Sequence, residues 1–203
     1  IAGIEVNTVR QRVMLSDAEL GIILPALGAY GIINELVIRI LLSTAQRIQA
    51  LMLSEWGDID FINKTWTIPP GDGRKSDRQF VVPITADIAG YFAELKVLAG
   101  LSKFVLPIQK LMKGRETCDA SMRQQTINNI LNRLCGDLQG KVRPFTPHDL
   151  RSTARSHFSV LGVNVVVAER CLNHSLGGLL AIYDVHDYLD ERRNALDLWC
   201  SKL

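Results

Sequence analysis

Four residues in the last third of the chain carry side chains suited to chemistry on a phosphate ester. His148 and Arg151 lie three positions apart, just after a Thr-Pro pair that is typical of a helix start, so both are expected on one face of the same helix. His174 follows, and Tyr183 comes nine residues after it. A guanidinium matches phosphate oxygens, an imidazole transfers protons, and a tyrosine hydroxyl can act as a nucleophile.

The order of these residues resembles the tyrosine recombinases of the phage integrase type. The family pattern is H-x-x-R, then G-H, then a nucleophilic tyrosine, and the strings HDLR and LNHSLGGLLAIY resemble it. Two earlier segments resemble the family in the same order. STAQRIQAL aligns Arg47 with the first catalytic arginine, and GRKSDRQFVVPI aligns Lys75 with the catalytic lysine. The ending of the chain looks most similar to integrases of prophages and genomic islands.

This resemblance implies site-specific recombination of double-stranded DNA by transesterification. A tyrosine attacks a backbone phosphate, the strand is held as a 3′-phosphotyrosine, and the 5′ hydroxyl of another strand then rejoins it. No cofactor, metal ion or small-molecule substrate is expected. The resemblance implies these roles: Tyr183 as nucleophile, Arg47 and Arg151 as stabilisers of transition-state charge, His148 in proton transfer, His174 as donor to a phosphate oxygen, and Lys75 as general acid for the leaving 5′ oxygen.

Two other functions stay open. A type IB topoisomerase uses the same chemistry and rejoins the same strand, and a catalytically inactive DNA-binding regulator or accessory protein would keep the fold without the reaction. The chain departs from the family pattern where Ala45 and Asn173 replace glycines and where Ala50 replaces a glutamate that orients its neighbours. All six side chains with implied roles are retained, which favours an enzyme.

Several residues have a simpler interpretation. Lys75 lies in a polar, basic turn, where a solvated lysine is the ordinary expectation. Tyr188 is a second tyrosine, but on a continuous helix it would lie about 140° around the axis from Tyr183. His157 and His186 are expected to be structural or surface groups.

Composition and charge agree with a DNA-binding protein of a bacterial cytoplasm. With 203 residues and 47% hydrophobic content, the chain can form one domain with a full core, and its longest apolar run is far shorter than the roughly 20 residues of a membrane helix. The four cysteines lie far apart without a C-x-x-C pair, which predicts reduced thiols. The net charge is only +2, but residues 103–170 contain eleven basic and five acidic residues, which favours a polyanionic partner.

We expect a mainly helical domain with a small three-stranded antiparallel β-sheet, an α+β fold, over residues 16–203. Residues 1–15 are expected to be a linker from a missing N-terminal DNA-binding region. Helices are predicted from Ser16, over 32–53 with a break and a new N-cap at Ser43-Thr44, and over 87–99, 120–138, 147–161, 165–172 and 189–203. Strands are predicted at 58–60, 65–68 and 79–82, with a Gly-rich turn at 71–75.

The last predicted helix has one apolar stripe among charged residues, formed by Leu189, Leu196, Trp199 and Leu203. Periodicity alone favours docking of this stripe on the chain's own core. The resemblance implies instead that the segment passes to a neighbouring subunit and links four protomers. We therefore expect a tetramer on DNA that is assembled through this helix.

Overall fold

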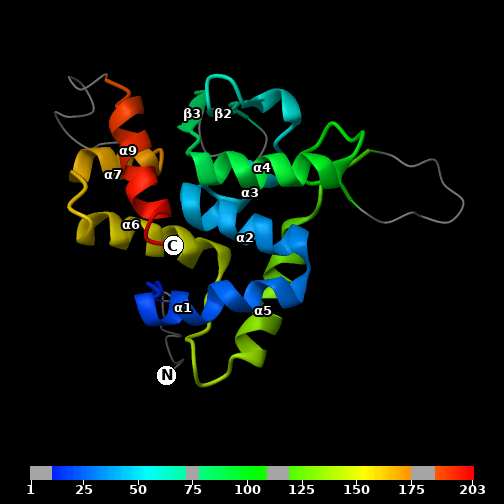
Figure 1. Ribbon diagram of the computed structural model, residues 1–203, viewed down its shortest axis with the longest axis vertical. Helices are drawn as coiled ribbons and strands as arrows, with labels where there is room; N and C mark the ends of the chain where they lie inside the picture. Colours follow the sequence, from blue (N-terminus) through cyan, green and yellow to red (C-terminus); the bar gives the residue numbers. More distant parts are fainter. Residues whose placement is uncertain (1–10, 72–77, 109–118, 175–185) are drawn as a thin grey trace, which may run out of the picture.

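The computed structural model describes residues 11–71, 78–108, 119–174 and 186–203. The chain is mainly helical with three short strands, as predicted (Figure 1). The helices are α1 (Asp17–Ala26), η1 (Leu27–Tyr30), α2 (Ile32–Thr44), α3 (Ile48–Met52), η2 (Trp56–Asp58), α4 (Ala86–Ala99), α5 (Gln124–Asp137), α6 (Pro147–Val160), α7 (Val165–Cys171) and α9 (Leu189–Cys200). The strands are β1 (Ile59–Asp60), β2 (Thr65–Ile68) and β3 (Phe80–Pro83).

Helix α2 is the centre of the core. Its buried apolar side chains are Leu36, Val37, Ile38, Ile40, Leu41 and Leu42. Because these residues point in many directions around the axis, neighbours must cover the helix on several sides. Helices α4, α6, α9 and η1 all pack against it, and Figure 1 shows α2 between α4 and α1.

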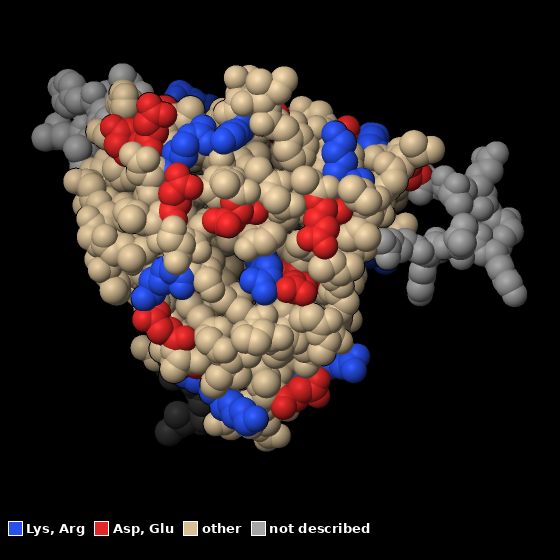
Figure 2. Space-filling view, in the orientation of Figure 1, with Lys and Arg blue, Asp and Glu red and all other residues tan. Residues whose placement is uncertain are grey.

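Charged side chains are scattered over the surface that covers this core. On the face shown in Figure 2, acidic and basic side chains lie interspersed. Ion pairs join some of them, such as Arg39 with Glu35 at 2.9 Å. Arg39 interrupts the apolar run of α2, and this ion pair gives its charge a partner. No helix in the described part of the chain is long and apolar enough to cross a membrane.

The three strands form one antiparallel sheet in the order β1-β2-β3. Trp66 of β2 lies opposite Ile59 of β1 and Val82 of β3. Its ring is fully buried, and its Nε1 donates to Ser54 Oγ at 3.0 Å. The edge-to-face contact with Phe92 of α4 has ring centroids 5.7 Å apart. One tryptophan therefore fixes the sheet to the helical part of the domain.

The capping box predicted at Ser16 is present and does more than cap α1. The backbone N–H of Glu19 donates to Ser16 Oγ at 3.3 Å, and the backbone N–H of Ser16 donates to the Glu19 carboxylate at 2.8 Å. The same carboxylate accepts a hydrogen bond from the Arg143 guanidinium at 2.6 Å. The start of α1 is therefore also tied to the segment that precedes α6.

The break after α2 comes later than predicted. Thr44 stays in the helix because its Oγ1 donates to the carbonyl of Ile40 at 2.7 Å, so the hydroxyl does not cap the next helix. The chain turns at Ala45, and Arg47 is the N-cap residue of α3. This shift matters because it places an arginine at the turn.

The helix predicted from residue 120 begins at Gln124 instead. The backbone N–H of Ile108 donates to the carbonyl of Ala120, and that of Met122 donates to the carbonyl of Leu106, both at 2.7 Å. Residues 120–122 are therefore held beside residues 106–108, and the helix starts only after this pairing ends.

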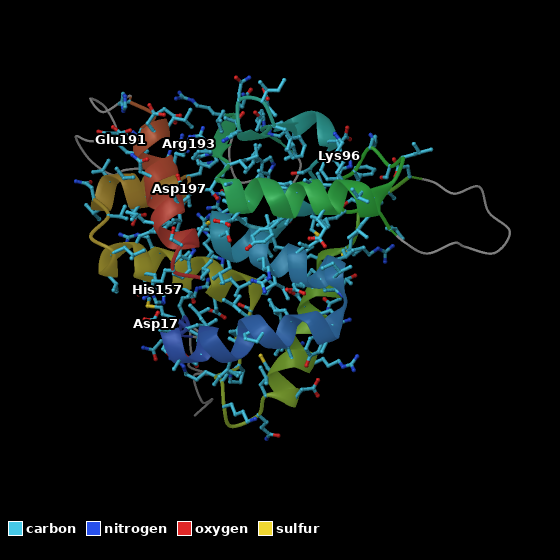
Figure 3. The ribbon with its side chains drawn as sticks, viewed as in Figure 1. Asp17, Lys96, His157, Glu191, Arg193 and Asp197 are labelled. Carbon is cyan, nitrogen blue, oxygen red and sulfur yellow. The ribbon has the colours of Figure 1, made fainter. Side chains whose placement is uncertain are left out.

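Helix α9 packs on its own chain in this structure. Trp199 is fully buried, its Nε1 donates to the carbonyl of Leu42 at 2.8 Å, and its ring stacks on His157 with centroids 4.9 Å apart. Figure 1 shows α9 lying across α6 and α7, and Figure 3 shows His157 and Asp17 near its C-terminal end. Lys202 pairs with Asp17 at 2.8 Å. Docking on the chain's own core, the arrangement that periodicity favoured, is thus the one observed.

The first turn of α9 is held by a buried arginine. Arg192 has 0% exposure and donates to the carbonyl of Val81 in β3 at 2.7 Å and to the carboxylate of Asp187 at 2.6 Å. Its guanidinium also lies 5.1 Å from the centroid of the Phe80 ring. The helix is therefore fastened near both ends.

Two neighbouring residues of α9 test this packing. Trp199→Ala should lower the free energy of unfolding by about 3–5 kcal/mol, because the ring is buried and its loss leaves a cavity. Leu198→Ala should change it by about 0.5 kcal/mol or less, since Leu198 is 53% exposed. Urea unfolding followed by circular dichroism measures both. Equal stability of the wild type and Trp199→Ala would show that α9 is not seated on the core in solution.

Candidate functional site

The start of α6 presents His148 and Arg151 as predicted. The Asp149 carboxylate accepts from the backbone N–H of Thr146 at 2.8 Å and from its hydroxyl at 2.6 Å, and Pro147 occupies the first helical position. This cap fixes where the helix begins. His148 and Arg151 then both line one pocket.

The guanidinium of Arg151 lies between the ends of two helices, and the residue as a whole is 2% exposed. Its Nη1 donates to the carbonyl of Ala45, the C-cap residue of α2, at 2.6 Å. Its Nη2 donates to the carbonyl of Leu172, the C-cap residue of α7. The C-termini of helices carry partial negative charge, so the two carbonyls offset much of the cost of burying this cation.

Arg151 remains charged at neutral pH although its surroundings oppose the charge. Burial and, after it, the charge of Arg47 lower the pKa of Arg151 to about 9, against the opposite effect of Glu169. An anion between the two arginines would remove their mutual repulsion. The pair is therefore suited to bind a phosphate.

His174 is held on both sides of its ring. Its Nε2 lies 3.0 Å from Nη2 of Arg151, and its Nδ1 lies 2.6 Å from the Glu169 carboxylate. Glu169 in turn accepts from Nε of Arg155 at 2.7 Å. The structure thus brings Arg151 and His174 into contact, and the hydrogen bonds continue through the Glu169 carboxylate to a second arginine.

Arg47 reaches the same pocket from the turn between α2 and α3. It is half-buried, and no carboxylate or carbonyl of the described residues forms a hydrogen bond or ion pair with it. A partly desolvated cation without such a partner favours an anionic ligand.

His148 lies close enough to these arginines for their charges to change the pKa of its imidazole. Partial burial lowers its pKa, and the charges of Arg12, Arg151 and Arg47 lower it further, while Asp149 opposes them. The imidazole is therefore neutral at pH 7 and able to accept a proton. An anion in the pocket would weaken this effect.

The pocket has a volume of about 540 Å³ and differs from the mixed surface of Figure 2. None of the described residues that line it is acidic. Beside the two arginines and His148, the polar side chains in its lining are Gln46, Gln49, Gln124, Gln125, Asn128, Asn132 and Thr146. Cations and neutral amides without a competing carboxylate make an anion-binding pocket.

Two residues next to the Arg151 contacts have left-handed backbone conformations, and both replace glycines of the family pattern. Ala45 has φ 55° and Asn173 has φ 51°. Glycine adopts this conformation without strain, whereas other residues lose about 1–2 kcal/mol, and asparagine tolerates it better than most. Ala45 and the residue just before Asn173 supply the two carbonyls that accept from Arg151. The glycine positions of the pattern therefore mark the turns that aim these carbonyls.

Sequence reasoning missed two side chains that shape the site. Glu169 lies five residues before His174 across a helix end, a spacing that is not part of the family pattern. Gln46 is buried and donates to the carbonyls of Thr44 at 2.9 Å and Cys171 at 2.8 Å, so it joins the same two helix ends as Arg151. The sequence offered one signal for these two residues, which is that each lies close in sequence to a predicted site residue: Glu169 to His174 and Gln46 to Arg47.

Lys75 and Tyr183 lie outside the described residues, as does most of the Gly-rich turn. Tyr188 is described and is the N-cap residue of α9, with φ 56° and an edge-to-face contact with His186. His157 is a buried residue of the core, as expected, and packs beneath Trp199. Among the described residues, no cluster of histidine, cysteine and acidic side chains has the form of a metal site.

Residues 15–189 match the sequence profile of the phage integrase family. The fold is similar to that of the Tn1549 transposon integrase, solved with circular intermediate DNA, with a TM-score of 0.64 at 17% identity over 93% of this chain and 66% of that one. The integrase of mycobacterium phage Brujita gives a TM-score of 0.67 at 15% identity over 97% and 60% of the two chains.

A lambda integrase dimer bound to a COC′ core site gives a TM-score of 0.63 at 17% identity, over 84% of this chain and 60% of that one. At such identities the likeness shows a shared fold. This chain spans about two thirds or less of the length of these structures. No protein with a curated description matches the sequence.

Inorganic phosphate should stabilise the protein through this pocket. A ligand at ten times its dissociation constant adds about 1.4 kcal/mol to the stability of the folded state. Thermal unfolding in phosphate and in chloride of the same ionic strength measures the gain, which should fall sharply in Arg47→Gln. Lys96→Gln, on α4 (Figure 3), removes the same charge outside the pocket lining and should keep the gain. Equal gains in Arg47→Gln and the wild type would place the phosphate elsewhere.

Proposed function

Because this chain belongs to the phage integrase family, we propose that it is the catalytic domain of a tyrosine site-specific recombinase that cuts and rejoins DNA. The observation that supports this most directly is the pocket where Arg47, His148 and Arg151 meet, in which no described lining residue is acidic, with His174 bonded to Arg151. We assign the catalytic domain to residues 16–203 and a linker to residues 1–15.

In the proposed reaction, the Tyr183 oxygen attacks a backbone phosphorus and gives up its proton as the new P–O bond forms. Lys75 protonates the 5′ oxygen as its bond to phosphorus breaks, and the strand stays attached as a 3′-phosphotyrosine. The 5′ hydroxyl of another strand reverses the step. Each step exchanges one phosphoester bond for another, so the reaction needs no external energy source.

The proposed roles of the pocket residues follow from their surroundings. Three of the five N–H groups of Arg151 are used by protein atoms in the described part of the chain, which leaves up to two for phosphate oxygens. Arg47 would bind the same phosphate from the opposite helix turn. His148, whose pKa is lowered by burial and by the nearby arginines, would help remove the tyrosine proton. Together the arginines would stabilise the charge of the transition state.

The proposed substrate is a double-stranded DNA attachment site of a prophage or genomic island, which would place the enzyme in a bacterial cytoplasm. The Tn1549 and lambda integrases were solved with DNA, and this supports DNA as the partner here. Polar amides beside the arginines suit a nucleic acid, because phosphates bind the cations and amides donate and accept hydrogen bonds at sugars or bases.

A pool of nicked duplexes with randomised core sequences tests the proposal. Cleavage beside the nick releases a short fragment, so a covalent complex accumulates and survives denaturation. Wild type and Tyr188→Phe should form this adduct. Tyr183→Phe should form none and still bind DNA, because the change removes one hydroxyl. An adduct in Tyr183→Phe would mean that another residue is the nucleophile, and no adduct with any protein would favour the inactive DNA-binding alternative. Relaxation of plasmid without recombinants would favour the topoisomerase.

We also propose that the protein forms a tetramer on DNA through an exchange of α9. Seating a neighbour's α9 on α2, α6, α7 and β3 would reproduce the contacts of Trp199 and Arg192 between chains. Such an exchange keeps every buried contact, so its free-energy cost is mainly the freedom that the two chains lose when they associate. The helix packing seen in one chain is thus compatible with either arrangement.

A disulfide can report which chain supplies α9. Cys200 Sγ lies 3.6 Å from Thr85 Oγ1, so Thr85→Cys would place two thiols side by side. Mild oxidation of the free variant should give an intrachain link, and oxidation in complex with paired DNA sites should give linked dimers and larger species on a non-reducing gel. Thr85→Cys combined with Cys200→Ser is the control and should give no such link. Intrachain links alone in the DNA complex would show that α9 stays on its own core.

A further inference from the structure

We infer that Glu169 is a positioning residue that holds His174 ready to donate a hydrogen bond to a substrate phosphate, with Arg155 fixing Glu169 in turn. The inference rests on the proposed function, because it concerns the use of His174 in phosphate binding. Arg151 and Arg155 of α6, Glu169 of α7 and His174, which follows α7, all lie in the described part of the chain.

The contact with Arg151 determines which nitrogen of His174 carries the proton. A guanidinium has donors and no acceptor, so at a distance of 3.0 Å Nε2 of His174 must accept from Arg151. The ring proton then lies on Nδ1, which donates to the Glu169 carboxylate at 2.6 Å. Both ring nitrogens are satisfied, and the ring cannot turn over without breaking both contacts.

This arrangement must change when a phosphate enters. To donate to a phosphate oxygen, Nε2 of His174 needs a proton of its own, which the ring takes up from solvent as Arg151 turns that N–H toward the phosphate. The imidazolium then donates from Nδ1 to Glu169 and from Nε2 to the phosphate. A carboxylate at Nδ1 stabilises that cation, as carboxylates do beside histidines in other catalytic sites.

Glu169 is itself held in place and ionised. Burial acts to raise its pKa, but the hydrogen bonds from His174 and Arg155 outweigh burial and lower it. Arg155 donates from Nε to Glu169 at 2.7 Å and from Nη1 to Ser159 Oγ at 2.9 Å, so its side chain is fixed at both ends of the guanidinium. Among the described residues, the charged groups that these hydrogen bonds link to the ring of His174 are Glu169, Arg151 and Arg155.

The position that carries a glutamate in the family pattern is Ala50 here, so that carboxylate is missing. In the described part of the chain, Glu169 supplies the carboxylate that forms a hydrogen bond with His174, one of the residues with an implied catalytic role. The oxygen atoms of Glu169 are divided, Oε1 for Arg155 and Oε2 for His174. Glu169→Gln keeps the shape but replaces one acceptor oxygen with a donor, so two donors must compete for one oxygen.

Imidazole ¹⁵N spectra of the free protein test the positioning without any reaction. The wild type should show His174 as the Nδ1–H tautomer, assigned by the signal that His174→Ala removes. In Glu169→Gln this signature should shift toward tautomer exchange, whereas Glu94→Gln, an exposed residue of α4, should leave it unchanged. An Nε2–H tautomer in the wild type, or identical spectra in Glu169→Gln, would overturn the inference.

Cleavage kinetics provide the second test. Glu169→Gln should slow adduct formation by about tenfold to a hundredfold, Glu169→Asp should restore part of the rate, and Glu94→Gln should have no effect. In a His174→Ala background, Glu169→Gln should cost nothing further, because a residue that acts through His174 has no function without it. Equal losses with and without His174 would assign Glu169 a purely structural role.

The outcomes separate this inference from the proposed function. If the wild type forms no adduct with any DNA, the proposed function fails, and the spectra still decide whether Glu169 sets the His174 tautomer. If His174→Ala slows cleavage and Glu169→Gln does not, the function stands and the inference is wrong.

Discussion

The site depends on one buried charge. Arg151 lies almost entirely inside the protein, and a guanidinium can be buried only where acceptors surround it. The carbonyls that end α2 and α7 provide those acceptors, at residues 45 and 172, so two helices that are far apart in sequence must end at the same point. Their C-terminal dipoles add negative potential there. Folding of the core and assembly of the site are therefore coupled through one side chain.

The remaining parts of the site follow from this meeting of helix ends. The turn after α2 carries Arg47 into the pocket, and the turn after α7 brings His174 against Arg151. Arg192 forms a similar contact at the sheet, where its buried guanidinium donates to a carbonyl of β3 and holds α9 in place. In both places an arginine joins elements by binding backbone, so a substitution by lysine would keep the charge but lose the forked geometry.

The sequence by itself determined the features that depend on neighbouring residues. The caps at Ser16 and Thr146, the strand at 65–68 and the common face of His148 and Arg151 were all predicted, because each follows from side chains within one or two turns. The antiparallel sheet and the mainly helical fold also follow from such local patterns. The family pattern then related these local features to a reaction.

Tertiary structure decided what depends on distant residues. The pairing of residues 120–122 with 106–108 delays the start of α5, and the buried seat of Trp199 places α9 on its own chain. The link from His174 to Glu169 exists because the chain turns in a left-handed conformation at Asn173, which lets an acid five positions earlier face the ring. Such contacts join residues whose separation in sequence says nothing of their separation in space, and only the packed core determines the path of the chain between them.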